Sequence, residues 1–148
     1  MFKHLLVPID GSELSQSALK QACAFAREAG ARLTIYHAKS VYLPYGMATE
    51  GAFDLAGVSE TYRIAMDKRV ESILNSAKQT ATEAGLECEV ISTECDEPYE
   101  GIVTTAQSYG CDLIFMASHG RHGASALMLG SDTQTVLAHC KIPVLVTR

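Results

Sequence analysis

Short apolar runs alternate with longer segments of helical periodicity along the whole of this sequence. The run HLLVPI, from His4 to Ile9, is continuous, as expected for a strand that is buried on both faces of a parallel sheet. From Leu14 to Ala26 the apolar residues recur at helical spacing, which predicts a helix that ends near Gly30. Ser12 or Ser15 can cap the start of this helix. Such alternation of strands and helices predicts an α/β fold.

The same alternation predicts four more strands and three more helices, with no proline-rich or serine-rich linker between them. Because crossovers between parallel strands are right-handed, we expect an open, doubly wound, mainly parallel five-stranded sheet, in the order 3-2-1-4-5, with four helices on its two faces, a nucleotide-binding Rossmann-like arrangement. Residues 1–148 are expected to form one domain. The further strands are predicted at Arg32 to Ala38, Leu86 to Ser92, Asp112 to Ala117 and Ile142 to Thr147, and the further helices at Ser59 to Ala84, Glu97 to Tyr109 (capped by Asp96) and Ala124 to Ala138.

The composition is that of a globular protein, since 47% of the residues are hydrophobic and 20% are charged. No apolar run approaches the roughly 18 residues that span a bilayer, and the first residues lack the pattern of a secretion signal, so we expect a cytoplasmic protein with no membrane partner. The net charge of -5 argues against long nucleic acids as partners. The charge does not exclude single nucleotides as ligands, because backbone amides can bind a phosphate group. Five scattered cysteines without a C-x-x-C pair predict reduced, mostly buried thiols.

Pro143 lies inside the last predicted strand. Because proline cannot donate to the hydrogen-bond ladder of a sheet, this strand is expected at an edge. Its apolar residues from Ile142 to Val146 would invite aggregation unless something covered them. We expect a second copy of the chain to pair there; the alternative is that the long glycine-rich connection from Lys39 to Val58 folds over the edge. That connection is either a mobile flap over a ligand site or a variable insertion.

Two glycine-containing turns follow strands that the predicted order places side by side. The first strand runs into IDGS and the fourth into ASHG, at the carboxyl edge where open α/β sheets bind ligands. In the stretch ASHGRHGASALMLGS, Gly120 and Gly123 permit positive φ angles and close approach of a ligand to the backbone. Gly130 interrupts a helical stretch, so a new helix can begin near it, with the Ser131 hydroxyl and unpaired amides pointing outward. Two such turns form a nest for phosphate oxygens that needs no lysine.

Other chemistries fit these residues less well. The P-loop and dinucleotide glycine patterns are absent, which weighs against fast phosphoryl transfer. His119 and His122 could suggest a metal, but no cysteine or carboxylate in the loop completes a ligand set, and His119 is expected to orient the loop through a ring hydrogen bond. Ser118 lacks the G-x-S-x-G context of a nucleophile, and Asp10 lacks the acidic pair and lysine of a phospho-accepting site. The remaining histidines are expected to be hydrogen-bonded structural residues: His4, His37 and His139.

Nearly the whole sequence is similar to the universal stress protein family. KHLLVPIDGSELSQSAL resembles the first strand and helix of that family, and DLIFMASHGRHGASALMLGSDTQTVLAHCKIPVLVTR resembles its fourth strand, glycine loop, last helix and last strand. The ATP-binding members of the family carry G-x2-G-x9-G-[ST], and here that register falls on Ala117, Gly120, Gly130 and Ser131. The departure is Ala117, which weakens the site if the position needs a positive φ or clearance for a Cβ and is harmless if its φ is ordinary.

The resemblance implies a homodimer that pairs through the last strand, Ile142 to Thr147, and that binds ATP, or ADP or AMP, with Mg. The adenine would lie near Pro8, Ala38 and Met116, with Asp10 near the ribose or a nucleotide-bound magnesium. The phosphates would follow the loop and meet the start of the last helix. The residues implied for that part are Ala117, Ser118, His119, Gly120, Arg121, His122, Gly123, Gly130, Ser131, Asp132 and Thr133.

Three functions remain open at this point. The first, which we favour, is an ATP-binding homodimeric regulatory module of the stress response. The second is a slow ATPase or nucleotide hydrolase, for which Asp10 and His119 are the candidate bases and Arg121 is the candidate arginine finger, so no catalytic residue is assigned. The third is a stress-response dimer that binds no nucleotide because of Ala117.

Overall fold

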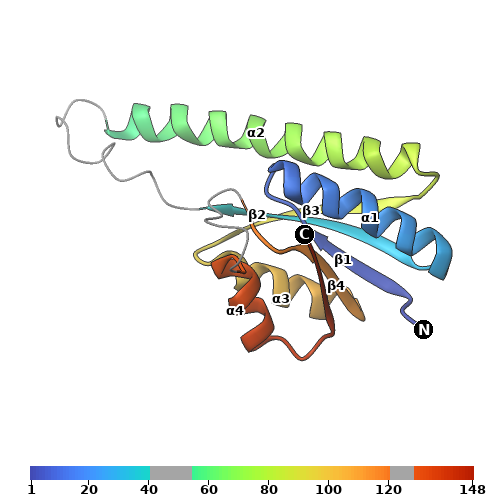
Figure 1. Cartoon of the computed structure of the whole chain (residues 1–148). Coiled ribbons are helices and arrows are strands. Elements are labelled where there is room, and N and C mark those ends of the chain that lie inside the picture. Colours follow the sequence, from blue (N-terminus) through green and yellow to red (C-terminus); the bar gives the residue numbers. More distant parts are fainter. Residues whose placement is uncertain (41–54, 121–128) are drawn as a thin grey trace.

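The structure, a computed structural model, describes residues 1–40, 55–120 and 129–148, with side chains described from residue 60 onward in the second range. Strands and helices alternate along these residues, as predicted (Figure 1). In chain order they are β1 His4–Pro8, α1 Glu13–Ala29, β2 Arg32–Ser40, α2 Leu55–Glu83, β3 Cys88–Cys95, α3 Pro98–Ser108, β4 Leu113–Ala117, α4 Ser131–His139 and β5 Val144–Thr147.

The five strands of the described residues form one parallel sheet in the order β3-β2-β1-β4-β5. Helices α1 and α2 cover one face of the sheet, and α3 and α4 cover the other (Figure 1). The predicted fold class and strand order are confirmed. Because β1 pairs with both β2 and β4, the chain order reverses between them. The carboxyl ends of β1 and β4 therefore lie side by side, where sheets of this kind bind ligands.

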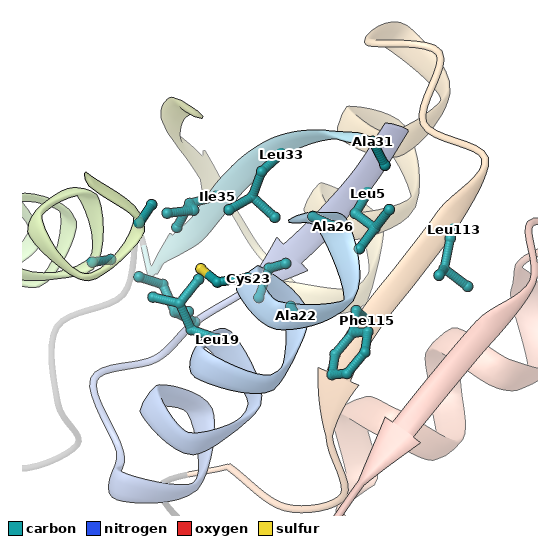
Figure 2. Packing of buried hydrophobic residues seen from close by; sticks show 14 residues of the cluster. Leu5, Leu19, Ala22, Cys23, Ala26, Ala31, Leu33, Ile35, Leu113 and Phe115 are labelled. Atoms are coloured by element: carbon teal, nitrogen blue, oxygen red, sulfur yellow. The ribbon is translucent and has the colours of Figure 1, made fainter. Parts of the chain in front are cut away.

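Adjacent residues of the central strands pack into two hydrophobic cores, one on each face of the sheet. On the face of α1 and α2, Leu5 belongs to a cluster with Leu33 and Ala22 (Figure 2). On the other face, Leu6 belongs to a cluster with Ile114. Leu5 and Leu6 are both fully buried, because side chains alternate along β1 and helices cover both sides. A fully buried leucine stabilises the fold by roughly 1.5–3 kcal/mol relative to an exposed one.

The outer pair of strands, β2 and β3, ends later than predicted. The two strands pair in register from Leu33 opposite Cys88 to Ser40 opposite Cys95. This pairing carries β2 beyond Ala38 and moves β3 from the predicted residues 86–92 to residues 88–95. Pairing across the sheet thus overrides the local alternation of apolar residues. The predicted flap, residues 39–58, falls largely on residues 41–54, which lie outside the described residues.

Helices α2 and α3 begin at residues other than those predicted. Helix α2 begins at Leu55 instead of Ser59, and its first turns extend beyond the carboxyl end of β2 (Figure 1). Helix α3 is preceded by Glu97 rather than capped by Asp96, and Pro98 occupies its first turn. Proline is favoured at this place because its missing N–H would have no partner inside the helix.

Helix α4 begins at Ser131, not at Ala124, so the predicted start was wrong and the predicted new start near Gly130 is correct. Gly130 has an extended backbone, with φ −59° and ψ 153°. Its amide donates to the carbonyl of Ser118 at 2.7 Å instead of to a helical acceptor. The helix is therefore set by a tertiary hydrogen bond. Residues 121–128 of the predicted loop and helix lie outside the described residues.

Strand β5 forms one edge of the sheet, as predicted. Pro143 precedes the strand instead of lying inside it, and its carbonyl accepts the amide of Ile114 at 2.9 Å. The proline thus contributes an acceptor to β4 while its lack of an N–H costs no ladder hydrogen bond.

The five cysteines are all free thiols. Cys23 and Cys111 are buried, and burial raises the pKa of each to about 11. The other three are partly buried, so fewer thiols are fully buried than predicted. Among the helices of the described residues, none is both long and apolar enough to span a bilayer.

Candidate functional site

Hydrogen bonds of buried residues join the end of β4 to the start of α4. Ala117 and Ser118 are both buried. The hydroxyl of Thr133 donates to the carbonyl of Ala117 at 3.0 Å, and the amide of Gly130 donates to the carbonyl of Ser118 at 2.7 Å. The amide of Ser118 in turn donates to the carbonyl of Thr147 in β5 at 2.7 Å. The first turn of α4 is therefore held against the end of the sheet.

Asp10, which follows the end of β1, lies close to Gly120 after the end of β4. Its Oδ1 accepts the amide of Ser12 at 2.9 Å, which orients the carboxylate at the start of α1. A Cβ added at Gly120 would lie 2.6 Å from the Oδ2 of Asp10, closer than real Cβ contacts allow. The backbone at Gly120 does not have a positive φ, so the sequence argument for left-handed geometry there was wrong. A larger residue at 120 would force the carboxylate of Asp10 to move.

A side chain at Gly130 would also be crowded. A Cβ at this position would lie 3.2 Å from the Cα of His119 and 3.3 Å from the carbonyl oxygen of Ser118, both backbone atoms that cannot rotate away. As the residue before α4, Gly130 offers no side chain to cap the first turn. The first amides of a helix that lacks such a cap are donors for an anion, aided by the helix dipole. Asp132 in the same turn places a negative charge beside them.

His119 has one ring nitrogen paired and one unpaired. Its Nδ1 forms a 3.0 Å hydrogen bond with the hydroxyl of Ser118, which confirms the predicted ring hydrogen bond. Its Nε2 is buried and has no hydrogen-bond partner in the described part of the chain. A buried polar atom without a partner costs about 1–3 kcal/mol. An atom in this position is therefore able to hydrogen-bond a ligand that enters the site.

Three predicted residues lie on one face of three neighbouring strands. Pro8 follows the buried Leu6 by two positions in β1, so it faces the side of α3 and α4. Ala38 and Met116 belong to the hydrophobic cluster on that same side. Pro8 and Ala38 are half-buried, whereas Met116 is 5% exposed. The structure therefore gathers these residues at the carboxyl edge next to Asp10.

Comparison with known proteins identifies the family. The model of the universal stress protein family matches residues 1–148. This chain belongs to the universal stress protein family. It is 34% identical over 152 residues to universal stress protein YxiE of Bacillus subtilis, with 100% of both chains covered. It is 31% identical over 163 residues to universal stress protein MJ0577 of Methanocaldococcus jannaschii, covering 100% of this chain and 96% of the relative.

Solved structures agree with this assignment. The structure of MJ0577 matches with a TM-score of 0.81 and 25% identity, over 99% of this chain and 96% of that one. A crystal structure of a universal stress protein in complex with cAMP matches with a TM-score of 0.71 and 25% identity, over 99% and 97% of the two chains. The fold of this universal stress protein is therefore that of its relatives along nearly its whole length.

Ala117, the departure from the family's glycine pattern, is an ordinary strand residue. It is the last residue of β4 and pairs with Thr147 of β5. A strand position has a negative φ that any residue adopts, so the backbone of this universal stress protein does not need glycine there. The other predicted loop residues, Arg121, His122 and Gly123, lie outside the described residues.

The histidines predicted to be structural are hydrogen-bonded in this universal stress protein. His4 lies between the hydroxyl of Thr34, 2.8 Å from Nε2, and the guanidinium of Arg32, 3.2 Å from Nδ1. Burial and the Arg32 charge lower the pKa of His4. His37 Nδ1 donates to a carbonyl at 2.8 Å, and His139 Nδ1 to another at 2.9 Å.

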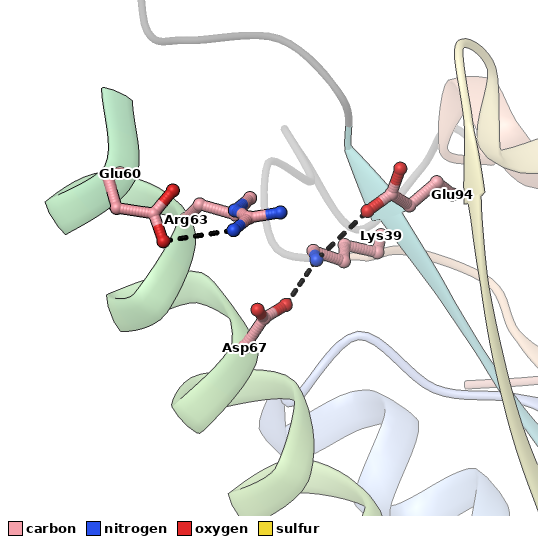
Figure 3. A network of polar contacts seen from close by, with 5 residues as sticks. All are labelled: Lys39, Glu60, Arg63, Asp67 and Glu94. Atoms are coloured by element: carbon pink, nitrogen blue, oxygen red, sulfur yellow. Dashed lines mark hydrogen bonds and ion pairs between the residues drawn. The ribbon is translucent and has the colours of Figure 1, made fainter. Parts of the chain in front are cut away.

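Sequence reasoning missed a polar network at the ends of β2 and β3. Lys39 forms ion pairs with Asp67 of α2 and, at 3.1 Å, with Glu94 of β3 (Figure 3). Its own side chain is 13% exposed, whereas those of Asp67 and Glu94 are 55% and 60% exposed. The hydrogen bonds that Lys39 donates to the carboxylates of Asp67 and Glu94 raise the pKa of Lys39. No sequence signal could have revealed the network, since the lysine was assigned to a loop and its partners are distant in the chain.

A buried tyrosine was missed as well. The hydroxyl of Tyr36 hydrogen-bonds that of Thr93 at 2.7 Å and contacts the thiol of Cys95 at 3.8 Å. Burial raises the pKa of Tyr36 to about 12. A Cβ at Gly101 of α3 would overlap the Tyr36 hydroxyl. The available signal was Gly101 itself, because a glycine inside a helix costs stability and so often marks close packing.

Proposed function

We propose that this universal stress protein is a homodimeric regulatory module that binds an adenine nucleotide, ATP or its products, with Mg at the carboxyl edge formed by β1, β4 and α4. The relative whose solved structure contains cAMP supports a nucleotide as the class of ligand. We further propose that residues 1–148 act as one domain in the cytoplasm, and that occupancy of the site reports the nucleotide level to partner proteins.

The observation that carries the proposal is the buried Nε2 of His119, which has no hydrogen-bond partner in the described part of the chain and lies at the end of β4 beside the start of α4. The backbone of Ser118 and His119 packs closely against Gly130, which precedes the first amides of that helix and offers no side chain to cap them. Uncapped amides at a helix start suit phosphate oxygens, which they can hold without lysine. Each hydrogen bond to a charged group contributes roughly 1.5–3 kcal/mol. Three or four such bonds with burial of the base approach the roughly 8 kcal/mol of a micromolar complex.

Each predicted residue then has a role. The adenine would lie over Pro8, Ala38 and Met116, which share one face of the sheet. The Asp10 carboxylate, already oriented by the Ser12 amide, would bind the ribose or the magnesium. The phosphates would meet residues 117–123, Gly130 and the first turn of α4, which contains Ser131, Asp132 and Thr133, and His119 Nε2 would hydrogen-bond one of their oxygens.

We propose binding rather than catalysis as the function. The P-loop and dinucleotide glycine patterns, which are typical of fast phosphoryl transfer, are absent from the sequence. Turnover above about 1 per second, the low end for ordinary enzymes, would favour the alternative of an ATPase.

The dimer is proposed to form through β5. This strand lies at the edge of the sheet, and its residues are partly exposed and apolar, Val144–Thr147 reading VLVT. Pairing of two copies along this edge would satisfy its outward backbone groups. Sedimentation at several protein concentrations measures this directly, and a protein that stays monomeric at all of them contradicts the dimer.

The nucleotide proposal is tested on the purified protein. Mass spectrometry of the denatured protein should detect bound ATP, ADP or AMP, and Mg-ATP should raise the melting temperature. Gly120→Val should abolish that rise, because the added side chain collides with Asp10. Ala117→Gly is the matched control and should keep it, because position 117 has an ordinary strand backbone. Absence of both co-purified nucleotide and a thermal shift, or equal shifts in Gly120→Val and the parent, would contradict the proposed site.

A further inference from the structure

A second cavity lies between α1 and α2, away from the proposed phosphate site. Its volume is about 160 Å³. Apolar side chains, among them Leu19 and Ala77, form part of its wall, and hydroxyl and amide groups form the rest. None of its lining residues is charged, although 20% of the chain is. A site without charges does not select an anion or a cation, so a ligand here would be neutral.

The polar part of the wall is a row of hydroxyls on α2. Ser72, Ser76 and Thr80 follow one another at helical spacing and all line the cavity. Thr80 donates to the backbone carbonyl of Ser76 at 3.1 Å. Ser72 and Ser76 are exposed, so this side of the cavity is open to solvent. Their hydroxyls can exchange water for a ligand.

We infer that this cavity is a binding site for a small, uncharged, ring-shaped molecule that carries a hydroxyl or amide group. An enclosed apolar cavity of about 150 Å³ accommodates a benzene ring; the cavity here has a similar volume but is open to solvent on the side of Ser72 and Ser76. The ring would lie against the apolar wall, and its polar substituent would hydrogen-bond the serines of α2.

The cavity is joined to the turn that positions Asp10. Ser15 is buried and lines the cavity, and its hydroxyl accepts the amide of Asp10 at 3.4 Å and donates to the carbonyl of Ser12 at 3.0 Å. Gly11, with φ 83°, packs against Ile73 so closely that a Cβ would lie 3.0 Å from the Cδ1 of that residue. Both Gly11 and Ile73 line the cavity. A bound molecule would therefore stiffen the turn that presents Asp10.

The binding is tested without nucleotide, with phenol and benzamide as probes. In methyl NMR spectra, the signals of Ile9 and Ile73 should shift saturably, with a dissociation constant on the order of 1 mM, as expected for ligands of this size. Ser76→Leu should abolish the shifts by filling the cavity. Asn75→Leu is the matched control, since Asn75 is the exposed neighbour on α2 and does not line the cavity. Shifts that do not saturate, or that persist in Ser76→Leu, overturn the inference.

A replacement variant and a separate measurement of coupling distinguish the possible outcomes. If Ser76→Leu does not fold, Ser72→Leu takes its place with the same expectation. The coupling to Asp10, unlike the binding, rests on the proposed function: saturating benzamide should change the Mg-ATP affinity of the parent about twofold or more, and ATP should change the benzamide affinity by the same factor. Probe binding without this change removes the coupling and leaves the second site, whereas absence of probe binding removes the site and leaves the nucleotide proposal untouched.

Discussion

The two halves of the carboxyl edge of the sheet differ in how their polar groups are paired. Where β2 and β3 end, side chains pair with each other: Lys39 with two carboxylates, and Tyr36 with Thr93. Where β1 and β4 end, Gly120 and Gly130 allow close packing beside an uncapped helix start, and the buried Nε2 of His119 has no partner among the described residues. Groups that are paired with each other have few donors or acceptors left for a ligand. The first half therefore stabilises the fold, whereas the second half is the part of the edge that we propose to bind a ligand.

The largest expected effect is on stability, from Gly101→Ala in the paired half. The added Cβ overlaps the Tyr36 hydroxyl and lies 3.0 Å from the sulfur of Cys95. Overpacking of this kind costs about 1–3 kcal/mol, seen as a lower urea midpoint. Tyr36→Phe removes the obstructing oxygen, so the double variant should be more stable than the sum of the single effects. Additive losses would show that the crowding lies elsewhere.

Gly130→Ala tests the binding half. The Cβ would press on backbone atoms of Ser118 and His119 and displace the first turn of α4. We expect Mg-ATP affinity to fall roughly tenfold, about 1.4 kcal/mol, in calorimetric titrations. Leu137→Ala, at an exposed position later in α4, is the control and should keep the affinity. An unchanged affinity in Gly130→Ala would mean that the phosphates do not bind at the start of this helix.

Asp10→Asn separates the charge of Asp10 from its shape. The amide oxygen can still accept the Ser12 amide, so the fold should be kept. Mg-ATP affinity should fall roughly threefold to fivefold, less than about 1 kcal/mol, because the carboxylate no longer attracts the ion. After removal of Mg with EDTA, the variant and parent should bind ATP equally. A difference that persists in EDTA would place Asp10 on the ribose.

The smallest effect is expected from Lys39→Met in the paired half. Because Asp67 and Glu94 are more than half exposed, the ion pairs contribute only about 0.5 kcal/mol at neutral pH. Since the pKa of Lys39 is raised above its ordinary value of 10.5, this contribution is present below pH 10.5 and is lost as the pH rises through the raised pKa. The stability difference between parent and variant, measured by urea unfolding, should therefore vanish in strong alkali. A difference that stays constant with pH would mean that packing, not charge, is lost.

Much of the fold follows from local pattern. HLLVPI and DLIFMA are continuously apolar because β1 and β4 lie in the middle of the sheet under helices. The prediction that the last strand lies at an edge is confirmed, although Pro143, on which it rested, precedes β5. Once β1 and β4 are neighbours, the meeting of Asp10 with Gly120 follows from topology. These inferences succeed because a short stretch of sequence is enough to indicate burial and chain direction.

The remainder depends on contacts between distant residues. The hydrogen bond from the amide of Gly130 to the carbonyl of Ser118 sets the start of α4. The periodicity of apolar residues does not indicate such a bond. The need for glycine at 101 comes from Tyr36 on another element. The length of β3 is decided by its partner β2. Local sequence shows that a residue is unusual at its position, but not which neighbour makes it so.

The hydrogen bond from the amide of Ser118 to the carbonyl of Thr147 joins the loop after β4 to the end of the outermost strand. In the proposed dimer, the second copy would fix that strand, and with it the backbone of Ser118, before any nucleotide arrived. The apparent affinity for nucleotide should then rise with protein concentration, and added nucleotide should drive monomers together. Cellular abundance of the protein, as well as the nucleotide level, would set how much of it is occupied.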